Sequence, residues 1–239
     1  MNFPFYIAMT SGEYNNCQIL PKSIAWMACH FSCYGTGLSN LPPKMQEGSM
    51  LIINDMLPPS GHDPVYITEQ LSELKESSGF SCLLLDFQRE GCTETAKIAK
   101  HISLTMDCPV GISEAYAHCC DGPAFLNCAQ PHCSLSEKLK LWNGRELWLE
   151  AVLEAETTRI YRDHCQISFV PYSSGEDSDS ECDVLRCRYR ILHKEDHVEL
   201  LQYRDIPQLE KLLYEAKDLG VTKAIGLFQQ LGASAIAIA

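Results

Sequence analysis

The sequence predicts an α/β fold, a closed (β/α)8 barrel of TIM type with a small antiparallel β insertion late in the chain. Short apolar runs that end in polar residues recur along the chain, and amphipathic helices follow several of them. This alternation is lost over about 159–205, which predicts the insertion. We expect one domain over 1–239, because 239 residues are enough for one sizeable core.

The barrel strands are predicted from apolar runs, since parallel strands buried on both faces are apolar along their length. The clearest run is Leu83-Leu84-Leu85-Asp86-Phe87-Gln88, in which three leucines precede two polar positions. Eight runs of this kind, enough to close a barrel, cover 3–9, 23–31, 50–55, 83–88, 109–113, 124–128, 146–153 and 222–228.

Three crossover helices have recognisable ends. The first lies between Asp63, a typical N-cap that is followed by proline, and Gly79, a typical C-terminal stop. The second is predicted over 93–104 with Thr93 as its cap, and the third over 207–219. Strands that alternate with such helices favour a parallel sheet.

The late insertion is predicted to hold strands at 167–171, 184–192 and 197–203, separated by turns. The acidic stretch 173–181 lies among them. Its dense oxygen ligands raise the alternative of a calcium site, but their spacing is not that of a calcium loop, so we interpret it as a solvated loop.

Composition limits the partners. The formal net charge of -12 argues against a nucleic-acid ligand, and the chain has no Lys/Arg run or apolar stretch that indicates a membrane. The start, Met1-Asn2-Phe3-Pro4, lacks the features of a leader, so we expect a cytoplasmic protein. The sequence leaves the oligomeric state open.

Thirteen cysteines occur at irregular spacings, with no C-x-x-C pair. One group could hold zinc, but its spacing favours reduced thiols that fill space, so we expect no metal and no cofactor. The residues of this group are His118, Cys119, Cys120, Cys128, His132 and Cys133.

Polar side chains at the carboxyl ends of the strands predict a site in the barrel mouth. Asp86 and Gln88 are two residues apart and therefore share a face of their strand. Strand-end carboxylates suit sugar chemistry, and aromatic rings give sugars a flat apolar face. The further candidates are Asp55, Glu114, Gln130, Glu154 and Gln229, with the aromatic residues Trp26, Tyr34, Phe87, Tyr116 and Phe228.

Three segments resemble family 18, the chitinase-like glycoside hydrolases: 83–88, the strand and helix that begin at 51, and the closing helix and strand within 203–228. The signature strand of that family ends D-x-D-x-E. Asp86 matches the second Asp, whereas Leu84 and Gln88 replace the first Asp and the final Glu. The resemblance implies a barrel that takes a glycan, with Asp86 orienting the acetamido group of the substrate.

The replaced Glu is the general acid of the family, and a glutamine cannot donate that proton. We expect Glu114 to be the substitute, because it ends the next strand beside Asp86, with Asp55 as a further choice. The sequence thus predicts a barrel of glycoside hydrolase type that binds or hydrolyses a glycan. The alternatives are an inactive barrel that binds a sugar or a protein, and an enzyme that uses the cysteine group.

Overall fold

The computed structural model describes residues 4–128, 130–170 and 179–232. The chain divides into two compact units. The barrel unit comprises Met1–Asn127, Gly144–Glu150 and Val221–Ala239, and the sheet unit comprises Cys128–Asn143 and Ala151–Gly220. A single domain over the whole chain stays a prediction.

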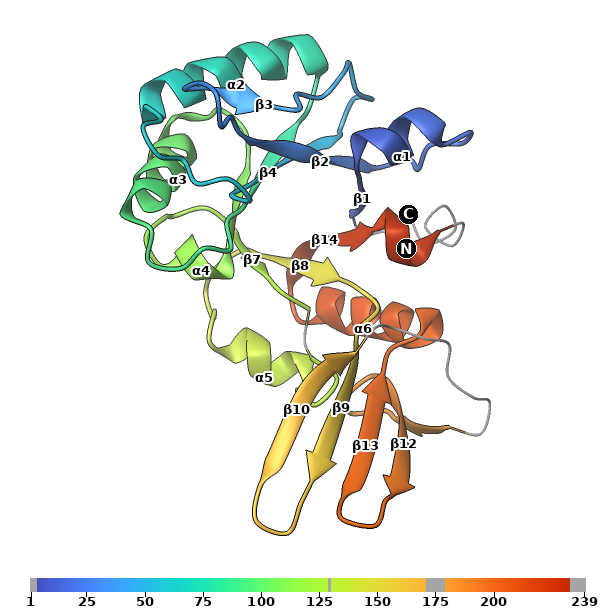
Figure 1. Ribbon diagram of the computed structural model, residues 1–239. Coiled ribbons are helices and arrows are strands. Elements are labelled where there is room, and N and C mark those ends of the chain that lie inside the picture. Colours follow the sequence, from blue (N-terminus) through green and yellow to red (C-terminus); the bar gives the residue numbers. More distant parts are fainter. Residues whose placement is uncertain (1–3, 129, 171–178, 233–239) are drawn as a thin grey trace. The chain divides into compact units, whose positions relative to one another are not determined.

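The barrel unit contains eight parallel strands that close on themselves, because β1 pairs with both β14 and β2 (Figure 1). This confirms the predicted TIM-type barrel, and each of the eight predicted runs overlaps one strand. A two-residue strand, β3 (Leu38–Ser39), adds to β2 in antiparallel fashion. The barrel strands are β1 (Phe5–Met9), β2 (Ile24–Phe31), β4 (Met50–Asn54), β5 (Cys82–Asp86), β6 (Val110–Ser113), β7 (Ala124–Leu126), β8 (Leu147–Ala151) and β14 (Val221–Leu227).

Side chains fill the interior of the barrel. Every second residue of a strand points inward, so Leu84, Phe125 and Trp148 meet there in one apolar cluster. The Trp148 ring lies against the backbone of Gly111, where an added Cβ would be only 2.2 Å from the ring. The large side chain on β8 therefore requires glycine on β6.

Two helices of the barrel unit are long. α2 (Pro64–Ser78) begins as predicted, since the Asp63 carboxylate accepts a hydrogen bond from the Val65 N–H at 3.1 Å. It ends at Gly79, whose φ of 82° suits glycine. α3 (Thr93–Thr105) corrects one prediction: its N-cap is Cys92, because the ladder starts with the bond from Ala96 N–H to Cys92 O.

The remaining helices include one predicted helix, α6 (Ile206–Asp218), capped by Asp205. The sequence did not reveal α1 (Ser11–Asn16), α4 (Glu114–Ala117), α5 (Leu135–Lys140) and α7 (Phe228–Leu231). Helices of four to six residues show too little periodicity to be recognised. No helix in the described part of the chain is long and apolar enough to span a membrane.

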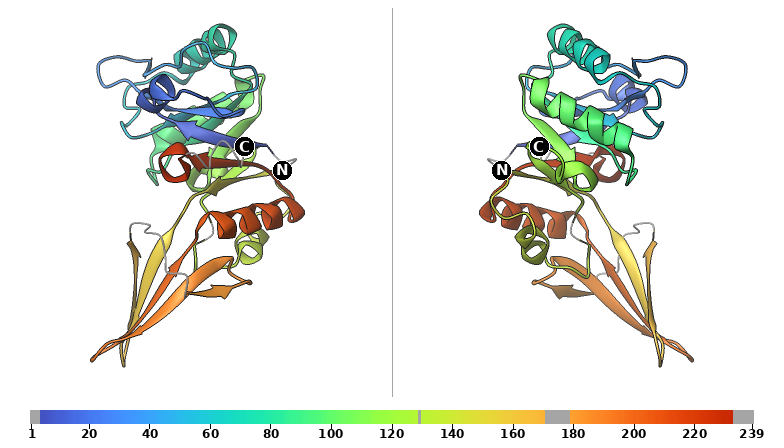
Figure 2. Two further views of the ribbon diagram at one scale, coloured as in Figure 1. Left: turned by 90° about the vertical axis from the view of Figure 1, so that its right-hand side faces the viewer. Right: turned by 90° about the vertical axis from the view of Figure 1, so that its left-hand side faces the viewer.

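The sheet unit carries the predicted antiparallel insertion, a sheet of five strands in the order β10-β9-β13-β12-β11. Its hairpin ends lie on the side away from α5 and α6 (Figure 2). The prediction missed β9 and also β11, whose residues 180 and 181 pair with β12 although the acidic stretch 173–181 was interpreted as a loop. The strand predicted over 184–192 begins only at Cys187, because 183–186 form a turn. Residues 173–178 of the acidic stretch lie outside the described residues. The strands are β9 (Ala155–Ile160), β10 (Cys165–Val170), β11 (Ser180–Cys182), β12 (Cys187–His193) and β13 (Val198–Tyr203).

Buried charges in the sheet unit are paired. The Asp179 carboxylate accepts two hydrogen bonds from Arg190, at 2.6 and 2.9 Å, and a third from the Tyr203 hydroxyl at 2.7 Å. The buried Glu156 lies 2.9 Å from His132 Nδ1. Pairing of this kind offsets the cost of removing a carboxylate from water.

Candidate functional site at the barrel mouth

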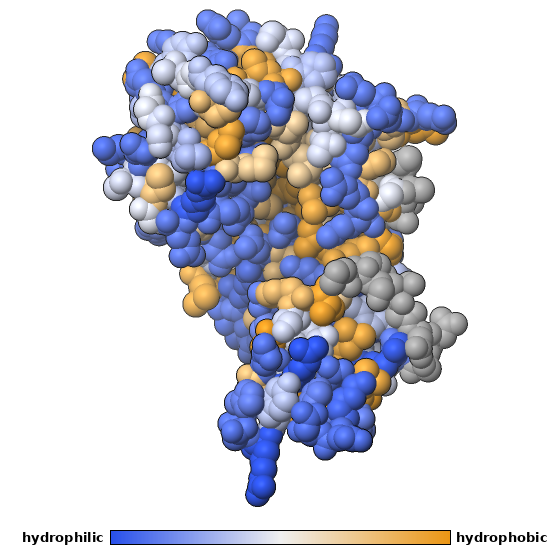
Figure 3. Space-filling view, viewed as in Figure 1, coloured by the Kyte–Doolittle hydropathy of each residue, from blue (hydrophilic) through white to orange (hydrophobic). Residues whose placement is uncertain are grey.

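A cavity of about 490 Å³ opens at the carboxyl ends of the barrel strands. Pockets of this size hold small ligands. In the space-filling view, apolar residues line a hollow on this face and hydrophilic residues surround it (Figure 3). The polar part of the lining is Asn54, Asp55, Asp86, Gln88, Arg89 and Glu150, and the apolar part includes Ala8, Met27, Ile52, Leu84, Phe125, Ile225 and Leu227.

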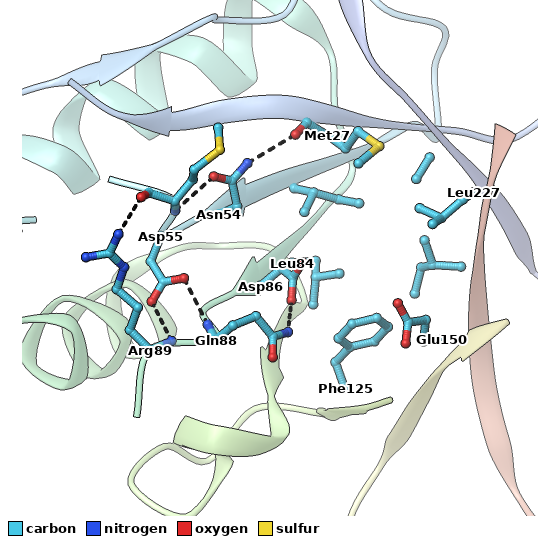
Figure 4. A pocket seen from close by; sticks show the side chains of 14 residues that line it. Met27, Asn54, Asp55, Leu84, Asp86, Gln88, Arg89, Phe125, Glu150 and Leu227 are labelled. Atoms are coloured by element: carbon cyan, nitrogen blue, oxygen red, sulfur yellow. Dashed lines mark hydrogen bonds between the residues drawn. The ribbon is translucent and has the colours of Figure 1, made fainter. Parts of the chain in front are cut away.

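Asp86 and Gln88 lie together in this cavity, as the spacing predicted. Asp86 is the last residue of β5 and follows the inward-facing Leu84 by two positions. The side-chain amide nitrogen of Gln88 donates a hydrogen bond to the Asp86 carboxylate (Figure 4). Burial raises the pKa of Asp86 above its usual range, the bond from Gln88 lowers it in part, and the nearby Asp55 carboxylate raises it further.

Asp55 also borders the cavity, but its carboxylate binds the backbone of the loop after β5. It is only 3% exposed, and its two carboxylate oxygens accept hydrogen bonds from the backbone N–H groups of Gln88 and Arg89, each at 2.9 Å. The carboxylate therefore fixes the position of the loop that carries Gln88.

Asn54 and Arg89 hold the neighbouring backbone. Asn54 is paired with Asp86 in the β4–β5 ladder, and its side-chain nitrogen donates to the Met27 carbonyl oxygen at 3.3 Å. Its side-chain oxygen accepts from the Met56 N–H at 3.2 Å. The Arg89 Nη2 donates to the Met56 carbonyl oxygen at 2.6 Å (Figure 4). These contacts link the loop after β4 to the loop after β5.

Glu150 is a site residue that the sequence analysis missed. It lies on β8, two residues after Trp148, and lines the cavity. The same period-2 alternation that places Trp148 in the interior places Glu150 at the mouth. The alternation could have predicted the direction of Glu150, but Leu149 and Ala151 on either side of it make the run look apolar on both faces. Glu154, the residue chosen instead, belongs to the sheet unit.

Glu114 and Tyr116 do not line the cavity that the described residues form. Glu114 is the first residue of α4. Tyr116 is buried, where its hydroxyl donates to the Arg89 carbonyl oxygen and accepts from the Cys92 N–H at 3.3 Å. Tyr116 therefore braces the loop after β5 from behind.

The other predicted aromatic and amide residues also lie elsewhere. Trp26 is buried on the outer side of its strand and donates to the Asn40 carbonyl oxygen at 2.9 Å, and Tyr34 is 98% exposed. Phe87 is fully buried in the same outer layer as Trp26. Phe228 and Gln229 begin α7, and Gln130 belongs to the sheet unit.

The cysteine and histidine group is divided between the two units. His118, Cys119 and Cys120 belong to the barrel unit, whereas Cys128, His132 and Cys133 belong to the sheet unit. All thirteen cysteines are free thiols. Among the residues that the structure describes, no three His, Cys, Asp or Glu side chains are placed to hold a metal ion.

No family model matches this sequence, and no curated protein matches it either. Solved structures do match. A chitinase from Chromobacterium violaceum has a TM-score of 0.59 and 7% identity, over 99% of this chain and 98% of the other. A family 18 N-acetylglucosaminidase from Paenibacillus barengoltzii has a TM-score of 0.59 and 8% identity, over 94% of each chain.

A class V chitinase from Nicotiana tobaccum, solved in complex with NAG4, has a TM-score of 0.59 and 10% identity, over 94% of this chain and 93% of the other. At identities this low, the similarity shows the fold alone. The chain therefore has the barrel fold of these chitinases and of the family 18 N-acetylglucosaminidase, as the resemblance of 83–88 implied.

Proposed function

We propose that the barrel mouth binds a glycan or glycan-like small molecule and does not cleave it. The observation that carries this proposal is the hydrogen bond from Gln88 to Asp86 inside the cavity. In the resemblance to family 18, Gln88 stands where the general acid would be. An amide can bind a sugar hydroxyl, but it cannot supply the proton that glycoside hydrolysis needs.

The rest of the lining supports a sugar ligand. Asp86, Gln88 and Glu150 provide hydrogen-bond acceptors, while Phe125 and Leu227 provide apolar surface in the same cavity. A sugar ring has hydroxyl groups at its edge and C–H groups on its faces, so this combination suits it.

Hydrolysis is the second candidate function, and Glu150 is the observation that favours it. Asp86 and Glu150 are two carboxylates in one cavity, and glycosidases use a carboxylate pair. In this alternative, one of the two would act as the acid in place of the missing glutamate, and Glu150→Gln would abolish cleavage.

Titration calorimetry against a panel of oligosaccharides tests the proposal. We expect at least one member to bind the wild type, and Asp86→Asn to weaken that binding about tenfold or more because an anionic acceptor is lost. Glu73→Gln, which likewise replaces a carboxylate by its amide at an exposed position of α2, is the matched control and should leave affinity unchanged.

Mass spectrometry of the recovered ligand separates the two candidates. Binding alone predicts that the oligosaccharide returns intact after prolonged incubation. Shortened products from the wild type, absent with Glu150→Gln, would establish hydrolysis instead. Failure of every sugar to bind, or equal binding by Asp86→Asn, would overturn the proposed site.

A further inference from the structure

The polar lining of the cavity carries more negative than positive charge. Among the residues that the structure describes, three carboxylates border it, those of Asp55, Asp86 and Glu150, and one guanidinium, that of Arg89. The raised pKa of Asp86 has the same origin, since burial and the Asp55 charge both oppose its ionisation. A positive charge placed in the cavity would relieve this opposition.

Several hydrogen-bond donors of the lining are already directed at protein oxygens. The Gln88 amide nitrogen donates to Asp86, the Asn54 amide nitrogen to the Met27 carbonyl, and Arg89 to the Met56 carbonyl. The backbone N–H groups of Gln88 and Arg89 both donate to the Asp55 carboxylate. These bonds occupy those donors, whereas a carboxylate oxygen can accept more than one hydrogen bond, so Asp86 can still accept from a ligand.

These two properties select among sugars. An N-acetyl group has one N–H that can donate to a carboxylate such as Asp86, and a carbonyl oxygen that requires a donor, whereas a protonated amine donates three hydrogen bonds and carries the complementary charge. We infer that the cavity prefers an amino sugar with a free, protonated amine over its N-acetylated form, with the amine held between Asp86 and Glu150.

The placement of the two carboxylates suits this ligand. Asp86 lies on β5 and Glu150 on β8, and Phe125 of β7 lines the hollow with them (Figure 4). A cation can interact with both charges and with the aromatic ring, while the sugar ring covers the apolar residues. The inference rests on the proposed function, because it names the ligand class of the same cavity.

Titration calorimetry with two tetrasaccharides, one of glucosamine and one of N-acetylglucosamine, tests the inference. At about pH 6 the free amines are protonated, since this is below the usual pKa range of an amine. We expect the wild type to bind the glucosamine tetramer about tenfold or more tightly than the acetylated one. Added salt should reduce this preference because it screens the charges.

Glu150→Gln should lower the preference for the glucosamine tetramer severalfold. Asp86→Asn, which removes the other carboxylate, should lower the same preference independently. Glu73→Gln is the control and should retain the full preference. Thermal unfolding of each variant checks that it is folded before its affinity is compared.

The outcomes separate the inference from the function on which it rests. Equal affinity of the wild type for both tetramers, or tighter binding of the acetylated one, would overturn the inference and leave the sugar-binding function standing. A preference that both carboxylate variants retain would also overturn it. Failure of both tetramers and of the wider panel to bind would remove the proposed function itself.

Discussion

The side-chain amide of Gln88 donates a hydrogen bond to the Asp86 carboxylate. Asp86 is the last residue of β5, and Gln88 lies two residues later in the loop that follows. The loop itself is held by Asp55, which accepts from the backbone of Gln88 and Arg89. The pair is therefore positioned before any ligand arrives, and such preorganisation lowers the entropy cost of binding.

Asp86→Asn is expected to stabilise the protein at neutral pH. Burial raises the pKa of Asp86, so its ionised form costs folding free energy that the neutral amide avoids. The cost builds as pH rises from the usual aspartate range, about 4, through the raised pKa. Urea unfolding at several pH values should show the gain at neutral pH and its disappearance in acid. A gain that does not change with pH would contradict this account.

Gln88→Glu is expected to destabilise the protein at neutral pH. It replaces the hydrogen bond to Asp86 with a second carboxylate, and two close negative charges each raise the pKa of the other. Protonation removes the repulsion, so the deficit should shrink as pH falls through those raised values. Thermal unfolding measures it, with the exposed Gln18→Glu as control. Equal melting temperatures for Gln88→Glu and the wild type at neutral pH would argue against close contact.

Asp55→Ala is expected to cost about 1–3 kcal/mol of unfolding free energy, because it leaves backbone N–H groups of the loop without their acceptor. Asp55→Asn keeps one acceptor oxygen and should cost less. Urea unfolding gives the stabilities, and calorimetry should show weaker sugar binding in both as the loop loosens. If alanine proved no worse than asparagine, the carboxylate would not anchor the loop.

Gly111→Ala is expected to destabilise the barrel by about 1–3 kcal/mol or more, since the new methyl group would meet the Trp148 ring at 2.2 Å. Gly12→Ala is the matched control. Gly12 lies in α1 with nothing within 4 Å of an added Cβ, so alanine should be neutral or mildly stabilising there. Equal effects at both positions, measured by thermal unfolding, would contradict the packing of Trp148.

The barrel could be predicted because its strands are buried on both faces. A run such as the three leucines before Asp86 is typical of such a strand. Caps such as Asp63 and Gly79 mark where the helices between strands begin and end. The missed strand β9 is different. Its sequence, Ala155–Ile160, mixes small, acidic and basic residues, because one part of it is buried and another exposed.

The site could be predicted only where alternation was clear. Asp86 and Gln88 follow an unbroken apolar run, so their direction was evident, whereas Glu150 is placed by the same rule in a strand of mixed character. Glu114 and Tyr116 were expected at the mouth, but the short helix α4 starts at Glu114 and turns the chain there. A sequence pattern does not show that turn.

The most direct measurement is a crystal structure of the protein grown with an oligosaccharide that gives heat on titration. We predict density for an intact sugar in the cavity, with one of its polar groups within hydrogen-bond distance of Asp86 and a ring face against Phe125. A sugar bound at another surface, with the cavity at the barrel mouth empty, would contradict the account.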